Sequence, residues 1–209
     1  MVMTDQQANS SPFVIGLTGG IACGKSYIAQ RFQDLGAHTL EADDIVRELT
    51  QPGEPAYQAI VDYFGSHIIK PDQQLDRPYL RQLIFNHPEH KQWLEQLIHP
   101  RVRNTMAQRV QTTPAPYHIL VIPLLIENLP NPLIQRIAVV EAPLELQYQR
   151  LLQRDHIDEQ LAQRIIDQQA HPDKRRQYAD DIINSALQPS ELNQSIQQLD
   201  HYYRQLAQQ

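Results

Sequence analysis

A glycine-rich stretch near the start of the chain restricts the fold more than any other feature. Residues 19–26, GGIACGKS, fit the pattern G-x-x-x-x-G-K-[ST]. The apolar run at 13–17 precedes them and is typical of a buried parallel strand, whereas 25–35 shows helical periodicity. A strand, a glycine turn and a helix in this order predict a phosphate-binding loop (P-loop), in which backbone N–H groups and the helix N-terminus surround phosphate oxygens.

Each residue type in this loop suits nucleotide chemistry. Lys25 would bring a positive charge to the β and γ phosphates of ATP, and the Ser26 hydroxyl would ligate the accompanying Mg²⁺. The predicted nucleotide-binding residues of the loop are Gly20, Ile21, Ala22, Cys23, Gly24, Lys25, Ser26 and Tyr27. Because a helix N-terminus can lower the pKa of a thiol, Cys23 has two open interpretations, a redox switch and a small residue that fills the loop.

The rest of the chain alternates between strand-like and helical segments, which predicts an α/β fold with a doubly wound parallel sheet. The stretch 56–111 is mainly helical and too long for a single crossover connection. We therefore expect one domain over 13–209, after a flexible polar segment at 1–12. Its predicted parts are a core (13–55, 116–142 and 180–209), an inserted helical subdomain (56–115) and a second helical region (143–179).

Composition narrows the classes of partner and compartment. The net charge of −6 argues against a general nucleic-acid-binding surface, which would be basic. The single cysteine allows no intramolecular disulfide and suits a reducing cytoplasm. The sequence shows neither an apolar run of membrane-spanning length nor the pattern of a signal peptide. We expect a cytoplasmic protein without nucleic-acid, membrane or obligate protein partners.

Three carboxylates follow the predicted second strand, at Glu41, Asp43 and Asp44. In open α/β sheets, ligands bind beyond the carboxyl ends of the strands. A carboxylate there can accept the proton of an acceptor hydroxyl or hold Mg²⁺ through water. It can equally cap the helix predicted after 44, and the spacing alone leaves both interpretations open.

Several motifs, in order along nearly the whole chain, resemble those of the dephospho-coenzyme A kinase family. Besides the P-loop, they are Leu35-Gly36, Ala42-Asp43, Tyr63-Phe64-Gly65, Leu75-Asp76-Arg77, Leu97-Ile98-His99-Pro100, Pro123-Leu124-Leu125 with Glu127, Gln153-Arg154-Asp155 and Ala179-Asp180. The resemblance implies transfer of the ATP γ-phosphoryl group to the ribose 3′-hydroxyl of dephospho-coenzyme A. That reaction gives coenzyme A and is the last step of its biosynthesis.

The resemblance also implies that the core is that of a P-loop kinase, that the helical subdomain at 56–115 binds substrate and that the helical region at 143–179 is a lid. It further implies roles for individual residues, with ATP and dephospho-coenzyme A as ligands and Mg²⁺ as cofactor. The implied catalytic residues are Asp43, Lys25 and Arg150, and Arg154 is an additional nucleotide-binding residue. The implied substrate contacts are Thr18, Asp43, Arg77 and His99. The metal would be held by Ser26, and by Asp43 through water. The chain departs from the family at Glu41 (usually Asp), Tyr27 (usually Thr), Ala22-Cys23 (commonly Gly-Ser) and Asn184-Ser185-Ala186 (usually Asn-x-Gly).

The lid region carries the remaining candidate cations. Arg150 and Arg154 lie one helical turn apart and should share a face over the nucleotide. The run at 174–176 is interpreted as a solvated basic face paired with acidic neighbours. His99 has two open roles, substrate contact and packing, and Pro100 is expected to end or bend its helix.

Two other functions fit parts of the sequence. A P-loop kinase for another nucleoside, nucleotide or small metabolite would need the same loop, and only the family motifs favour dephospho-coenzyme A. A GTP-dependent switch or binding module would explain the D-x-x-G match at 62–65. That match lies within an amphipathic stripe, however, and the guanine motif N-K-x-D does not occur in the sequence.

Overall fold

The computed structural model describes residues 11–167 and 169–209. The predicted flexible segment therefore lies, for residues 1–10, outside the described part of the chain. The chain forms two compact units, one comprising residues up to Thr39 together with Thr113–Gln209, and the other comprising Leu40–Thr112. The sequence-based borders of the substrate subdomain and the lid stay predictions.

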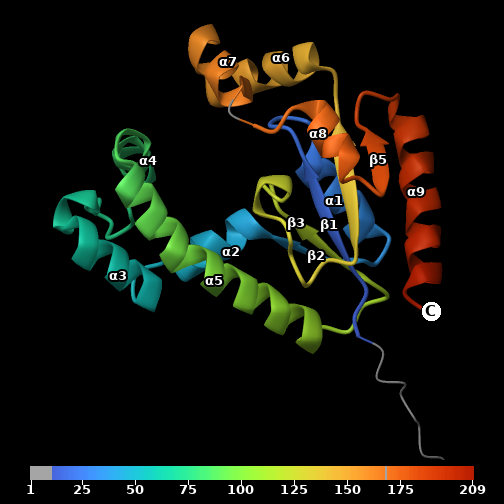
Figure 1. Ribbon diagram of the computed structural model, residues 1–209, viewed down its shortest axis with the longest axis horizontal. Helices are drawn as coiled ribbons and strands as arrows, with labels where there is room; N and C mark the ends of the chain where they lie inside the picture. Colours follow the sequence, from blue (N-terminus) through green and yellow to red (C-terminus); the bar gives the residue numbers. More distant parts are fainter. Residues whose placement is uncertain (1–10, 168) are drawn as a thin grey trace, which may run out of the picture. The chain divides into compact units, whose positions relative to one another are not determined.

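A five-stranded sheet carries the first unit, and its strand order is β2-β3-β1-β4-β5 (Figure 1). The strands are β1 Val14–Gly19, β2 His38–Glu41, β3 His118–Val121, β4 Arg136–Glu141 and β5 Asp181–Asn184. Strand β1 pairs in parallel with β3 and β4, and β4 pairs in parallel with β5. The predicted α/β class with a doubly wound sheet is confirmed.

The position of β1 determines where a ligand can bind. This strand is buried along its whole length because it has a neighbouring strand on each side. The chain leaves β1 toward one edge of the sheet and leaves β4 toward the other, so the strand order reverses between these two neighbours. Open α/β sheets bind ligands at such a reversal, beyond the carboxyl ends of the strands. The glycine loop follows β1 at this place.

Helices α1 and α9 pack together against the sheet (Figure 1). The helices of this unit are α1 Lys25–Asp34, η2 Ile126–Asn128, α6 Leu144–Asp155, α7 Glu159–Asp167, α8 Pro172–Gln177 and α9 Pro189–Leu206. Phe32 and Tyr203 lie fully buried in the shared core, with ring centroids 5.8 Å apart. Burying each large apolar side chain contributes about 1.5–3 kcal/mol, so this core fixes α1 on the sheet.

The second unit is helical, as expected for much of its length. Its helices are α2 Ala42–Leu49, α3 Pro55–Phe64, η1 Ser66–Ile68, α4 Arg77–Asn86 and α5 Pro88–Thr112. Helix α5 packs against α2, α3 and α4. The Tyr63 ring stacks on that of Trp93, with centroids 3.8 Å apart. Asp62 lies within α3, so the D-x-x-G match begins in a regular helix and does not form a loop.

Pro100 does not end its helix, which was one of the two outcomes expected for it. Helix α5 continues through it over 25 residues. Proline lacks the N–H that would bond to the carbonyl of Gln96, four residues earlier. Both residues are exposed, so this carbonyl can turn to water, and the helix tolerates the missing bond.

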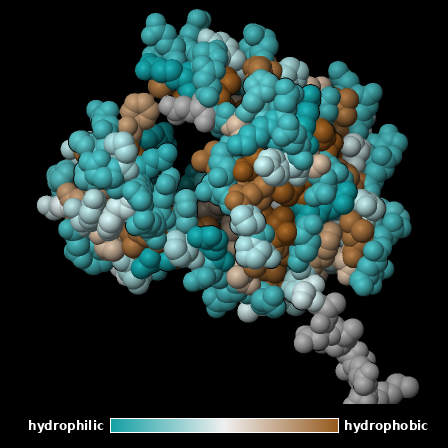
Figure 2. All heavy atoms as spheres, viewed as in Figure 1, coloured by the Kyte–Doolittle hydropathy of each residue, from teal (hydrophilic) through white to brown (hydrophobic). Residues whose placement is uncertain are grey.

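The described helices differ from membrane spans in length and composition. None of those in the described ranges is both long and apolar enough to cross a membrane. Figure 2 shows hydrophilic side chains over much of the visible face.

A buried histidine pair makes the first unit sensitive to acid. His118 is 2% exposed, and its Nδ1 lies 2.9 Å from Nδ1 of His38. Burial, with a smaller effect from His38, lowers the pKa of His118 from 6.5 to about 4. Between these two pH values the unfolded chain binds the additional proton. The contribution of His118 to stability is therefore complete above about pH 6.5 and is lost as the pH falls toward about 4.

Urea unfolding at pH 7.5 and pH 5 measures this loss. We expect the His118→Asn variant, which keeps a polar partner for His38 without titrating, to lose less unfolding free energy between the two pH values than the unaltered chain. An equal loss in both proteins would show that His118 does not cause it.

Candidate active site

The glycine loop has the geometry of an anion cradle. Strand β1 ends at Gly19, and α1 begins at Lys25. Gly24 precedes α1 in a left-handed conformation (φ 94°), and no side chain caps the helix. The N-terminus of α1 therefore directs its N–H groups toward the loop, and N–H groups at a helix N-terminus bind phosphate oxygens. Ala22 also has a positive φ of 54°, a conformation that favours the glycine common at this family position.

Lys25 points back along its own loop. Its Nζ donates hydrogen bonds to the carbonyl oxygens of Gly19, at 3.0 Å, and Gly20, at 2.9 Å. These contacts hold the ammonium group at the start of the loop, where it reaches phosphates bound to the loop amides. Ser26 and Tyr27 follow on the exposed side of α1, and the Tyr27 ring lies against Arg31.

Cys23 is part of the core. Its side chain is fully buried, and burial raises the pKa of the thiol although the nearby charges of Lys25 and Arg175 oppose the shift. A raised pKa disfavours the reactive thiolate. The structure therefore favours the loop-filling interpretation over the redox switch.

Helix α6, in the predicted lid region, and the residue after β5 both contact the loop. Arg150 Nη1 lies 3.4 Å from the carbonyl oxygen of Ala22 and 3.5 Å from Ser185 Oγ. The Ser185 hydroxyl donates a hydrogen bond of 2.5 Å to the carbonyl of Cys23. Ser185 belongs to the segment that departs from the family pattern, and here it braces the P-loop.

The second lid arginine is engaged elsewhere. Arg154 is exposed and forms an ion pair with its neighbour Asp155, with Nε and Oδ1 2.7 Å apart. Arg150, by contrast, lies at the loop.

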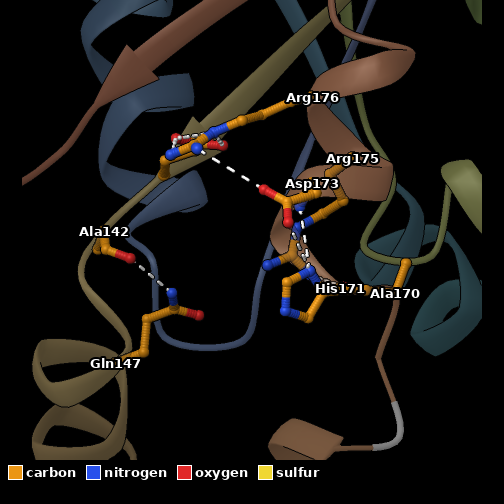
Figure 3. A network of polar contacts seen from close by, with 8 residues as sticks. Ala142, Gln147, Ala170, His171, Asp173, Arg175 and Arg176 are labelled. Carbon is orange, nitrogen blue, oxygen red and sulfur yellow. Dashed lines mark hydrogen bonds and ion pairs between the residues drawn. The ribbon is translucent and has the colours of Figure 1, made fainter.

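Three side chains that were not predicted to belong to the site surround the first residues of the loop. Ile21 N–H donates to Gln169 Oε1 at 2.8 Å. A Cβ built on Gly20 would lie 2.2 Å from Gln147 Oε1 and 3.1 Å from Arg175 Nη2. Gln147 is held by a 2.7 Å hydrogen bond to the Ala142 carbonyl (Figure 3). The sequence offered no local signal for these contacts, because all three residues come from beyond residue 140.

The run at 174–176 is only partly a solvated face. Arg176 is exposed and pairs with the Glu141 carboxylate at 2.9 Å, as the sequence predicts for such a face. Arg175 is buried, which corrects that interpretation. The two side chains leave α8 in different directions in Figure 3, since neighbouring positions on a helix point about 100° apart.

Glycine is required at position 19, and its replacement gives a testable result. Gly19 has φ 152°, and a Cβ there would lie 2.3 Å from the backbone oxygen of Val140. We expect Gly19→Ala to lower the free energy of unfolding by about 2 kcal/mol or more, because backbone must shift. Gly53→Ala is the control: it has a positive φ of 94° but open space around the new Cβ. Equal losses in thermal unfolding would contradict the clash.

Asp43 lies in the first turn of α2, in the second unit. The N-cap position belongs to Glu41, and the side chain of neither Asp43 nor Asp44 caps the helix, so the alternative role as a cap is wrong. Asp44 pairs with Arg47 at 3.0 Å. In the described chain, the exposed Asp43 carboxylate has no ion-pair partner. A carboxylate directly after β2 is thus accessible to a ligand.

The other predicted substrate residues have different surroundings. Arg77 Nη2 donates to Thr50 Oγ1 at 2.7 Å, and burial followed by repulsion from Arg47 lowers its pKa. Arg77 is therefore held at the C-terminal end of α2. His99 is exposed on α5. In the first unit, Thr18 is buried and donates to the carbonyl of Pro123 at 3.2 Å, so its hydroxyl supports the loop after β3.

The predicted metal ligands are suitable in kind. Mg²⁺ prefers hard oxygen ligands and usually retains several waters, with one or two protein oxygens and the substrate phosphates completing its shell. The Ser26 hydroxyl at the start of α1 and the Asp43 carboxylate are both exposed oxygen donors. Each of them, taken by itself, is a ligand type that suits magnesium.

Comparison with known proteins agrees with this arrangement. A family model described as dephospho-CoA kinase matches residues 13–190. A dephospho-CoA kinase of Hahella chejuensis is 43% identical over 195 residues, covering 93% of this chain and 94% of its own. That of Escherichia coli K12 is 38% identical over 197 residues, covering 94% and 96%.

A solved structure shares the fold. The crystal structure of TT1252 from Thermus thermophilus superposes with a TM-score of 0.80 at 25% identity, covering 91% of this chain and 97% of its own. The P-loop at the strand reversal, the lid contacts and the match over most of the sequence lead to one conclusion: the chain belongs to the dephospho-CoA kinase family.

Proposed function

We propose that this protein transfers the γ-phosphoryl group of ATP to the ribose 3′-hydroxyl of dephospho-coenzyme A, giving coenzyme A and ADP. The observation that carries this proposal is the family match over residues 13–190, which includes a P-loop with its lysine in place. The reaction would be the last step of coenzyme A biosynthesis, and a cytoplasmic location is part of the proposal.

The first unit supplies the nucleotide site in this proposal. The loop amides and the first turn of α1 bind the phosphate chain of ATP, and Lys25 neutralises its negative charge. Arg150 adds a second cation from α6, 3.4 Å from the Ala22 carbonyl. Bound Mg²⁺, held by Ser26 and by Asp43 through water, would neutralise the charge that develops on the phosphate oxygens.

The second unit supplies the acceptor side. Asp43 orients the 3′-hydroxyl of dephospho-coenzyme A and accepts its proton as the oxygen attacks phosphorus. The bond between the γ-phosphorus and the bridging oxygen of ATP breaks, and ADP leaves with that electron pair. Arg77 and His99 contact the rest of the acceptor. Among these, Asp43 is favoured because its carboxylate is exposed and is not used as a helix cap.

A different acceptor is the main competing proposal, because the P-loop chemistry would be unchanged. ADP release from ATP and Mg²⁺ should be compared for dephospho-coenzyme A, nucleosides and nucleoside monophosphates. We expect turnover with dephospho-coenzyme A alone. Turnover with another acceptor only would replace the proposed substrate, and ATP binding without any turnover would favour a switch or binding module.

A further inference from the structure

Arg175 is a charged side chain in a buried position. Its exposed fraction is 7%, and it comes from α8, within the predicted lid region 143–179. Arginine is rarely buried to this extent without a partner of opposite charge. The predicted solvated basic face accounts for Arg176 but not for the burial of Arg175, which needs another explanation.

The described residues give Arg175 no counter-ion. Its Nη1 donates to the carbonyl oxygen of Ala170 at 2.6 Å, whereas its Nε is buried without a hydrogen-bond partner. No carboxylate in the described ranges forms an ion pair with it, although Asp173 on the same helix pairs with His171 and Arg176 (Figure 3). An unpaired buried cation is costly for a protein, and an anionic ligand removes that cost.

The guanidinium group lies where a phosphate chain would bind. Lys25 Nζ, the group that reaches the β and γ phosphates, is held by the carbonyls of Gly19 and Gly20. Arg175 Nη2 approaches the same residue, since a Cβ on Gly20 would lie 3.1 Å from it. The charge of Arg175 is close enough to act on Cys23 within the loop.

The connection that precedes α8 already occupies one donor of the loop. Gln169 Oε1 accepts the hydrogen bond of Ile21 N–H at 2.8 Å. An amide oxygen thus lies at a backbone donor of the kind that a P-loop offers to phosphate oxygens. Gln169 and Arg175 together place an oxygen and a cation from one segment at the start of the loop.

We propose that Arg175 is a phosphate-binding residue of the nucleotide site, pairing with the terminal phosphates of a bound nucleoside triphosphate beside Lys25. The inference rests on the proposed binding of ATP at the P-loop. The bound triphosphate provides the missing counter-charge, and the guanidinium in turn stabilises the charge that spreads over the transferred phosphoryl group. Gln169 holds the Ile21 amide until a phosphate oxygen replaces it.

Calorimetric titration with ATP and Mg²⁺, and separately with inorganic tripolyphosphate, tests this role without any acceptor. We expect Arg175→Met to raise both dissociation constants by roughly 10-fold to 100-fold, the effect of losing a charge-assisted hydrogen bond. The Tm of the ligand-free protein should not fall, because the variant removes an unpaired buried charge. Arg175→Lys, which keeps the charge without the fork, should recover part of the affinity.

Arg176→Met is the matched control, since it removes the same charge from the next position of α8, where the side chain is exposed and pairs with Glu141. It should bind both probes within about twofold of the unaltered chain. If the methionine variant does not fold, the same dissociation constants are measured with Arg175→Gln, which can keep the hydrogen bond to Ala170. Dissociation constants unchanged in the Arg175 variants, with or without a lower Tm, would overturn the proposal and leave a structural role.

This test is independent of the acceptor. A protein that binds ATP through Arg175 yet leaves dephospho-coenzyme A unchanged would contradict the proposed function and retain the inference. If the protein phosphorylates dephospho-coenzyme A and its Arg175→Met variant binds ATP with full affinity, the proposed function is retained and the inference about Arg175 is contradicted.

Discussion

Lys25→Ala is expected to lower kcat by roughly 100-fold to 1,000-fold or more with the chain still folded. Phosphoryl transfer requires little covalent work from the protein, so charge stabilisation and positioning supply most of the rate. The Lys25 ammonium, fixed by the carbonyls of Gly19 and Gly20, is a preorganised cation for the transferred group. Steady-state kinetics with ATP and dephospho-coenzyme A, together with thermal unfolding, measure the two parts of this prediction.

Lys91→Ala is the control for the loss of a lysine. Lys91 is exposed on α5 and lies 3.9 Å from Glu95, so its removal should change kcat by less than about twofold. If Lys25→Ala retained a tenth or more of the activity, the loop would not be acting as the proposed phosphate site.

Asp43→Asn is expected to lower kcat by roughly 100-fold to 10,000-fold, the usual contribution of a general base. Asparagine keeps the size and polarity of the side chain but cannot accept the proton of the 3′-hydroxyl. ATP binding is expected to change little, because the loop amides and Lys25 are assigned to the phosphates, whereas Asp43 is assigned to the metal only through water. Kinetics and calorimetry on the same preparation separate the two effects.

Asp44→Asn is the matched comparison. Both residues lie in the first turn of α2, so both substitutions lose the same favourable interaction with the helix dipole, about 0.3–1 kcal/mol. Only Asp43 is assigned to the chemistry, since Asp44 pairs with Arg47. Similar kcat values for the two variants would mean that Asp43 has no special role.

The sequence predicts the nucleotide loop well because that information is local. The apolar strand, the glycines and the helix that follows are contiguous, and glycine is needed at Gly24 for its left-handed conformation. Gly36, with φ 96°, follows α1 in the left-handed region, where glycine commonly ends a helix. Asp158 accepts a hydrogen bond from Leu161 N–H at 2.8 Å, a local contact typical of an aspartate that precedes a helix.

The environment of the loop could not be predicted in the same way. Arg175 and Arg176 are neighbouring residues of the same type, so the sequence does not distinguish them. Only the packing of α8 beside β4 determines that Arg175 is buried and that Arg176 is exposed. The contacts of Gln147, Gln169 and Ser185 with the loop depend likewise on tertiary structure. Charge patterning describes helix faces but not the element on which a face packs.

Two rules for where helices begin and end also gave wrong predictions. Proline predicts the end of a helix, yet Pro100 lies on the exposed side of α5, where water can replace the lost bond. An aspartate before a helix predicts a cap, but α2 begins one residue earlier than Asp43. Because the helix starts before it, Asp43 does not occupy the cap position, and its carboxylate is accessible to a ligand.

Identification of the phosphorylated position tests the central claim most directly. The product of a reaction with ATP, Mg²⁺ and dephospho-coenzyme A should be examined by phosphorus NMR, and the 3′-deoxy and 2′-deoxy acceptors should be compared with it. The account predicts a new phosphomonoester on the ribose 3′-oxygen, turnover of the 2′-deoxy acceptor and none of the 3′-deoxy acceptor. A phosphate at another position, or turnover of the 3′-deoxy acceptor, would contradict it.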